Sequence, residues 1–67
     1  MNITELRYLV AIKKWGSVSA AAKQLYAAQP NVSKALKNLE GEYGLRIFER
    51  SSTGMIPTEQ GLSLIHI

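Results

Sequence analysis

The chain has 67 residues, of which 46% are hydrophobic and 19% charged, and its formal net charge is +3. A domain of about this size buries only roughly 60% of the surface that its unfolded chain exposes. We therefore expect one small, marginally stable domain, with no disulfide or thiolate metal site because cysteine is absent, and no cavity large enough for an enzyme or a small-molecule receptor.

The first predicted helix ends before Gly16, a residue type that commonly follows a helix. Asn2 or Thr4 can cap its start. Its apolar residues recur at helical spacing and are Ile3, Leu6, Leu9, Val10 and Ile12.

The second helix is predicted to start after Ser17, a good N-cap, and to end near Tyr26. Val18, Ala21, Ala22 and Leu25 follow at helical spacing. The small alanines let another helix approach closely on that face.

A connector of about three residues leads to a third helix, which Pro30 helps to start and Gly44 ends. Its apolar stripe is Val32, Leu36, Leu39 and Tyr43. Its opposite face is polar and basic, with Asn31, Lys34, Lys37 and Asn38.

After Gly44, residues 45–50 indicate a short strand, 51–54 a turn and 55–56 a returning strand, and Thr58 is a candidate cap for a further helix. The predicted fold is mostly α: a winged helix-turn-helix of three helices plus a short β-hairpin wing.

The placement of charge fits a polyanionic partner, and it also fits an ordinary face of solvated lysines. Between Glu5 and Glu40 the chain contains one arginine and five lysines but no acid. No secretory signal or membrane-spanning run is evident, so we expect a cytoplasmic protein with no membrane partner.

The chain also resembles the N-terminal region of LysR-type transcriptional regulators. The resemblance extends without a gap over residues 1–61. The blocks that carry it are Leu6–Ala11, Gly16–Val18, Ala21-Ala22, Leu25, Gln29–Lys34, Leu39-Glu40, Gly44-Leu45, Ile47–Arg50 and Pro57–Gly61.

The resemblance implies a bacterial transcription factor that binds double-stranded DNA in a sequence-specific way, as a dimer or tetramer, and responds to a small co-inducer. It implies that residues 1–58 form the DNA-binding domain, with the helix-turn-helix at about 18–37. The third helix would enter the major groove, and residues 51–54 would form the wing.

The candidate DNA-binding residues fall into three groups. On the third helix, Gln29, Pro30, Asn31, Ser33 and Lys34 occupy the positions that face bases or nearby phosphates in the family, and Lys37 shares their basic face. Arg50 corresponds to the family's arginine directly before the wing, and Ser52 and Thr53 lie in the wing. Ser17 caps the second helix, where neighbouring backbone N–H groups can meet phosphate.

Two departures from the family pattern concern the third helix. Ala28 stands where serine or threonine usually caps it, so we expect its start to fray. Lys34 stands where arginine is commoner, and lysine lacks the bidentate fork that recognises guanine.

The remaining residues indicate no catalytic chemistry. Tyr8, Trp15, Tyr26 and Phe48 are predicted to be core residues, because they share no face on which bases could stack. The single histidine, His66, has no cysteine or carboxylate cluster beside it. We expect neither an enzyme nor a cofactor or metal.

The end of the chain has two interpretations. In the family a long linker helix that forms the dimer begins near Thr58, so residues 59–67 are expected to be the truncated start of that helix, without an effector domain and with weak dimerisation or none. Residues 62–67 also resemble one reading frame of a transposon-end adapter used in library preparation, so we expect them to be non-native. The alternative is a genuine apolar start to the linker helix.

Two other functions stay open at this point. A protein-interaction module would bind through the apolar tail residues Leu62, Leu64 and Ile65, without regard to salt. A nucleoid-type binder would respond to salt but show no sequence preference.

Overall fold

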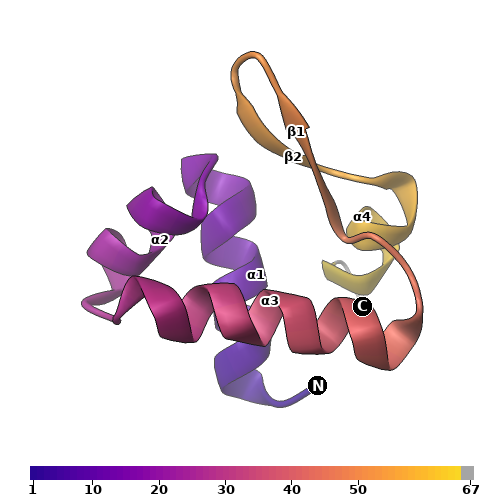
Figure 1. Cartoon of the computed structure of the whole chain (residues 1–67), viewed down its shortest axis with the longest axis horizontal. Helices are drawn as coiled ribbons and strands as arrows, with labels where there is room; N and C mark the ends of the chain where they lie inside the picture. Colours follow the sequence, from indigo (N-terminus) through magenta and orange to yellow (C-terminus); the bar gives the residue numbers. More distant parts are fainter. Residues whose placement is uncertain (66–67) are drawn as a thin grey trace.

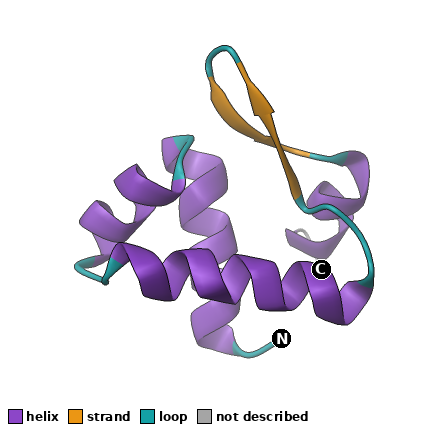
Figure 2. Cartoon of the chain, viewed as in Figure 1, coloured by secondary structure: helices purple, strands orange, loops and turns teal. Residues whose placement is uncertain are grey.

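The computed structural model describes residues 1–65. Three helices precede a two-stranded antiparallel hairpin, and a short fourth helix follows it (Figure 1, Figure 2). The elements are α1 (Ile3–Trp15), α2 (Val18–Leu25), α3 (Gln29–Tyr43), β1 (Phe48–Ser51), β2 (Gly54–Pro57) and α4 (Glu59–Ile65). The predicted winged helix-turn-helix, with a mostly helical chain, is confirmed.

The start of α1 is fixed by Asn2 rather than by Thr4. The Asn2 side-chain oxygen accepts the Glu5 N–H at 2.8 Å, and the Glu5 carboxylate accepts the Asn2 N–H at 3.0 Å. This reciprocal capping box satisfies two backbone donors that the helix itself leaves unpaired. The helix ends at Gly16, whose φ of 83° lies in the left-handed region that favours glycine.

The predicted apolar face of α1 is only partly correct. Leu9 and Ile12 are completely buried, whereas Ile3 is 77% exposed and Val10 is 44% exposed. At 100° per residue, Ile3 and Val10 lie close together on one side of α1, and that side is not buried in the core.

Ser17 caps α2 as predicted, because its Oγ accepts the Ala20 N–H at 3.0 Å. Ala21 and Ala22 are buried between the helices, as their small size suggested. This arrangement lets α2 pack on both α1 and α3 and completes the helix-turn-helix.

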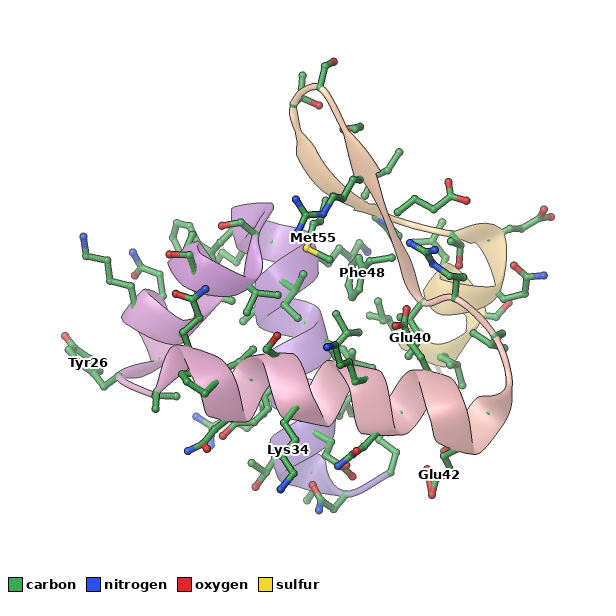
Figure 3. The ribbon with its side chains drawn as sticks, viewed as in Figure 1. Tyr26, Lys34, Glu40, Glu42, Phe48 and Met55 are labelled. Carbon is green, nitrogen blue, oxygen red and sulfur yellow. The ribbon has the colours of Figure 1, made fainter. Side chains whose placement is uncertain are left out.

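The prediction that Tyr8, Trp15, Tyr26 and Phe48 lie in the core is wrong for two of these residues. Phe48 is 2% exposed, but Tyr26 is 97% exposed and Trp15 is 45% exposed. Tyr26 ends α2 in the left-handed conformation (φ 54°), which turns its side chain away from the helices (Figure 3). Trp15 is the last residue of α1, and the Lys14 ammonium lies 5.3 Å from the centre of its ring.

The start of α3 lacks a side-chain cap, as the alanine at position 28 predicted. The Asn31 N–H donates instead to the Ala28 carbonyl at 3.0 Å, and Pro30 has no N–H to satisfy. Few donors are therefore left open in this first turn. Val32, Leu36 and Leu39 are buried in the core as predicted, whereas Tyr43 is 40% exposed.

The first strand begins at Phe48, three residues later than the pattern predicted. The residues between α3 and β1 are held by Glu40, which begins the last turn of α3. Its carbonyl accepts the N–H groups of Gly44 and Leu45, and its carboxylate accepts the Ile47 N–H at 2.8 Å. These bonds fold the chain into a turn where a strand was expected.

We call β1, β2 and the loop between them the wing. Phe48 pairs with Pro57, Glu49 with Ile56, Arg50 with Met55 and Ser51 with Gly54. Phe48 and the adjacent Ile47 are buried, so the base of the wing belongs to the core while its tip stands out from the helices (Figure 2).

The predicted cap at Thr58 is confirmed, and it also ties α4 to the wing. Thr58 Oγ1 accepts the Gly61 N–H at 2.9 Å, while the Thr58 N–H donates to the Ile47 carbonyl at 2.9 Å. Gly61 lies so close to the Ile47 carbonyl that a Cβ at this position would collide with it. Through Ile65, which is 9% exposed, α4 reaches the core.

Candidate DNA-binding surface

A groove of about 460 Å³ opens between α3, the start of α2 and the wing. We call it the wing groove. Its lining comes from three separate parts of the chain and comprises Gly16, Ser17, Val18, Ser19, Gln29, Ser33, Leu36, Lys37, Glu40, Arg50, Ser51, Gly54 and Met55. Most of the polar lining residues bear hydroxyl, amide or cationic groups that can donate hydrogen bonds.

The α3 side of the wing groove includes Gln29, Ser33 and Lys37, beside Leu36 and Glu40. The first three follow one another at intervals of four residues, so they lie on one face of the helix. The adjacent face contains Val32 and Leu39, which are buried against α1 and α2. Burial of that apolar stripe therefore fixes which polar side chains face the groove.

Three other predicted residues of α3 lie outside the groove. Pro30, Asn31 and Lys34 are exposed but do not line it. In Figure 3 the Lys34 side chain points away from the wing. The polar surface of α3 is thus wider than the groove.

Ser17 lies at the edge of the wing groove at the start of α2. Its hydroxyl oxygen is already occupied by the Ala20 N–H, which makes capping its role in the described chain. Sequence reasoning missed Ser19, which is exposed and also lines the groove. Its position in the first turn of α2, two residues after the cap, was the available signal.

Arg50 lines the groove from the wing side. An arginine at this position can pair with a neighbouring carboxylate or stay free for a phosphate. Neighbouring residues of a strand point to opposite faces, so Glu49 is directed away from Arg50. Within residues 1–65, Arg50 forms no salt bridge, and its side chain is exposed.

The other two predicted wing residues, Ser52 and Thr53, form the exposed loop at the tip and do not line the groove. The loop is shaped by Ser51, which sequence reasoning assigned only to a turn. Its hydroxyl donates to the Gly54 carbonyl at 2.7 Å and lies 3.2 Å from Thr53 Oγ1.

The wing is attached to the turn between α1 and α2. The Met55 N–H donates to the Gly16 carbonyl at 2.7 Å. A Cβ on Gly54, whose φ is 128°, would stand 2.6 Å from that same carbonyl oxygen. This contact, which no sequence pattern indicated, holds Arg50 opposite α3.

A metal site and a membrane-spanning helix are both absent from the described residues. No group of three or more histidine, cysteine, aspartate or glutamate side chains in residues 1–65 is placed to hold a metal ion. None of the helices in that range is both long and apolar enough to cross a membrane. His66, and with it the end of the segment 62–67, lies outside the described residues.

Comparison with protein families gives one match that spans most of the chain. A model described as "Bacterial regulatory helix-turn-helix protein, lysR family" matches residues 3–62. The nitrogen assimilation regulatory protein nac of Klebsiella aerogenes is 41% identical over 61 residues, which are 91% of this chain and 20% of nac. The transcriptional regulator MetR of Haemophilus influenzae is 39% identical over 67 residues, which are 100% of this chain and 22% of MetR. The chain thus spans about a fifth of the length of these relatives.

Solved structures of the same architecture include complexes with DNA. The DNA-binding domain of BenM bound to benA site 1 DNA superposes with a TM-score of 0.89 at 36% identity, covering 98% of this chain and 77% of that one. The DNA-binding domain of CbnR in complex with DNA superposes with a TM-score of 0.88 at 32% identity, covering 98% and 76%.

Proposed function

The chain belongs to the lysR family of bacterial regulatory helix-turn-helix proteins, and we propose that it binds double-stranded DNA with α3 in the major groove and the wing against the backbone. One observation carries the proposal: Gln29, Ser33 and Lys37 of α3 line a groove together with Arg50 of the wing. The major groove of DNA is wide enough to admit an α-helix. A wing held beside that helix then meets the flanking phosphates.

The side chains fall into two groups by chemistry. Gln29 can pair bidentately with adenine, and Asn31 and Ser33 can also bond to base edges, so this group provides sequence preference. Lys34, Lys37 and Arg50 are exposed cations that neutralise phosphates and provide affinity. Lys34 lacks the planar fork of arginine, so we assign it to phosphate rather than to guanine.

Four further residues complete the proposed contact surface. Pro30 fixes the first turn of α3 against the bases. Ser17 sets the start of α2, whose backbone N–H groups point towards a phosphate. Ser52 and Thr53 extend the contact along the backbone from the tip of the wing.

At the level of the whole protein, we propose that residues 1–58 are the DNA-binding domain of a transcriptional regulator that acts in the cytoplasm, where bacterial DNA lies. In this proposal α4 begins a linker helix that joins two copies into a dimer or tetramer. Two copies occupying adjacent half-sites gain affinity from their linkage, and an isolated domain does not.

A salt titration tests DNA binding. Fluorescence anisotropy of a labelled mixed-sequence duplex, at about 50 and 200 mM salt, is expected to give a log–log slope of roughly −3 or steeper, because at least three phosphates are neutralised. Failure of the folded chain to bind at the lower salt contradicts the proposal. Equal affinity for every competitor duplex identifies a nonspecific nucleoid-type binder instead.

A second surface favours the alternative of a protein-interaction module. An apolar groove of about 300 Å³ lies where the start of α1 meets the end of α3 and α4, lined by Met1, Asn2, Ile3, Leu6, Tyr43 and Leu64. Of the tail residues expected to bind a partner, Leu62 is 37% exposed, whereas Ile65 is buried. Binding that ignores salt and is lost when Ile3 and Leu64, which both line this groove, are replaced by serine supports this alternative over DNA.

A further inference from the structure

Glu40 organises the whole turn that leads from α3 into the wing. Its backbone carbonyl accepts the N–H groups of Gly44 and Leu45. Its carboxylate Oε2 accepts the N–H of Ile47 at 2.8 Å. In Figure 3 the Glu40 side chain rises from α3 towards the segment that enters β1, while Glu42 points away on the far side of the helix.

The position of Glu40 conflicts with the charge that DNA binding requires. Glu40 lines the same wing groove as Lys37 and Arg50. If this groove faces phosphates, as the proposed function holds, the carboxylate repels them and lowers affinity. A role for this carboxylate in DNA binding must therefore lie in what it holds in place.

Glu40 holds Ile47, the residue directly before the wing. Ile47 is completely buried, so its N–H has no access to water and depends on this acceptor. The Ile47 carbonyl is held independently by Thr58. Without the Glu40 carboxylate, the backbone of Ile47 is bonded to Thr58 but no longer to α3.

We propose that Glu40 is a positioning residue for DNA binding, which fixes Ile47 and thereby holds Arg50 of the wing beside α3. The inference rests on the proposed function for its effect on affinity, but not for its effect on the wing itself. It separates two properties of one side chain: the negative charge weakens binding, and the hydrogen bond to Ile47 strengthens it.

Two conservative substitutions separate these properties. Glu40→Gln removes the charge but keeps an oxygen that can accept the Ile47 N–H. Glu40→Asp keeps the charge but shortens the side chain by one methylene, which withdraws the acceptor. Glu42→Gln and Glu42→Asp are matched controls on the same helix, because the Glu42 side chain is exposed and its nearest cation is the chain's amino terminus at 3.7 Å.

The measurements are duplex affinity at several salt concentrations and hydrogen exchange of the Ile47 amide without DNA. Glu40→Gln is expected to lower the dissociation constant about twofold, because it removes a negative charge from the groove. Its log–log salt slope is expected to be at least as steep as that of the wild type. Glu40→Asp is expected to flatten the slope by about one, as Arg50 loses its phosphate, and to speed exchange at Ile47 about tenfold.

An Asp variant that keeps the wild-type slope and the wild-type exchange at Ile47 overturns the inference, as does a Gln variant that exchanges as fast as the Asp variant. The exchange measurement requires no DNA. If the Ile47 amide of Glu40→Asp exchanges as slowly as in the wild type, the positioning role is contradicted, even when DNA binding is intact. If the wild-type chain does not bind the duplex, the proposed function is contradicted. The comparison of Ile47 exchange between the variants remains valid in that case.

Discussion

Replacing Lys34 and Lys37 together by alanine is expected to flatten the log–log salt slope of DNA binding by about two and to weaken binding about uniformly across duplex sequences. Both lysines are exposed on α3, and no acid of the described chain forms a salt bridge with either. Each can therefore release the counterions of one phosphate. Anisotropy titrations at about 50 to 200 mM salt measure the change.

The matched control is the double variant Arg7→Ala, Lys14→Ala. It removes the same number of positive charges from exposed positions of α1, which lies behind α3 in Figure 1. A slope close to that of the wild type is expected for this control. Equal flattening in both double variants means that net charge alone drives binding, and it contradicts the contact surface proposed on α3.

Replacing Phe48 by alanine is expected to lower the free energy of unfolding by about 3–5 kcal/mol, the usual cost of deleting a buried phenylalanine. Phe48 is 2% exposed and joins the wing to the helical core. A domain of this length has a total stability of only roughly 3–10 kcal/mol. Urea or thermal unfolding followed by circular dichroism is expected to show a chain that is largely unfolded or close to it.

Tyr26 is also aromatic, but its replacement is expected to have little effect on stability. Because its side chain is 97% exposed, Tyr26→Asn is expected to change the free energy of unfolding by no more than about 0.5 kcal/mol. Asparagine also tolerates the left-handed backbone at this position better than tyrosine does. Strong destabilisation by Tyr26→Asn, or mild effects of Phe48→Ala, contradicts the arrangement of the core described here.

The helices could be predicted because their signals are local. The Asn2 and Ser17 caps, and the glycines at positions 16 and 44, each act within one turn of the residues they affect. Apolar spacing then placed Val32 and Leu39 correctly in the core. These signals decide where a helix starts and ends, and the structure agrees with them there, whereas the predicted apolar face of α1 is only partly buried.

Side-chain burial at the ends of helices could not be predicted from residue type. Trp15 and Tyr26 are large and apolar enough for a core, but each lies at a helix end, where the chain turns away. Hydrophobicity alone does not report that direction. Tyr43 is 40% exposed for the same reason.

The wing groove was likewise only partly predictable. Gln29 and Ser33 were predicted from the family resemblance, and Lys37 was predicted from the polar face of α3. The position of the wing residues on the other side of the groove could not be predicted, because the contact between Met55 and Gly16 joins segments that are far apart in the sequence. The delayed start of β1 has a similar cause, since the Glu40 carboxylate bonds to a residue seven positions later.

The central claim is that α3 and the wing form the surface that meets DNA. The most direct test is amide chemical-shift mapping of the isotope-labelled chain during titration with a duplex of roughly 20 base pairs, about two helical turns. The largest changes are expected at residues 29–37, at Arg50 and at the first turn of α2. Changes concentrated instead at Ile3, Leu6 and Tyr43, with α3 and the wing unaffected, contradict the claim and place the interaction on the apolar groove.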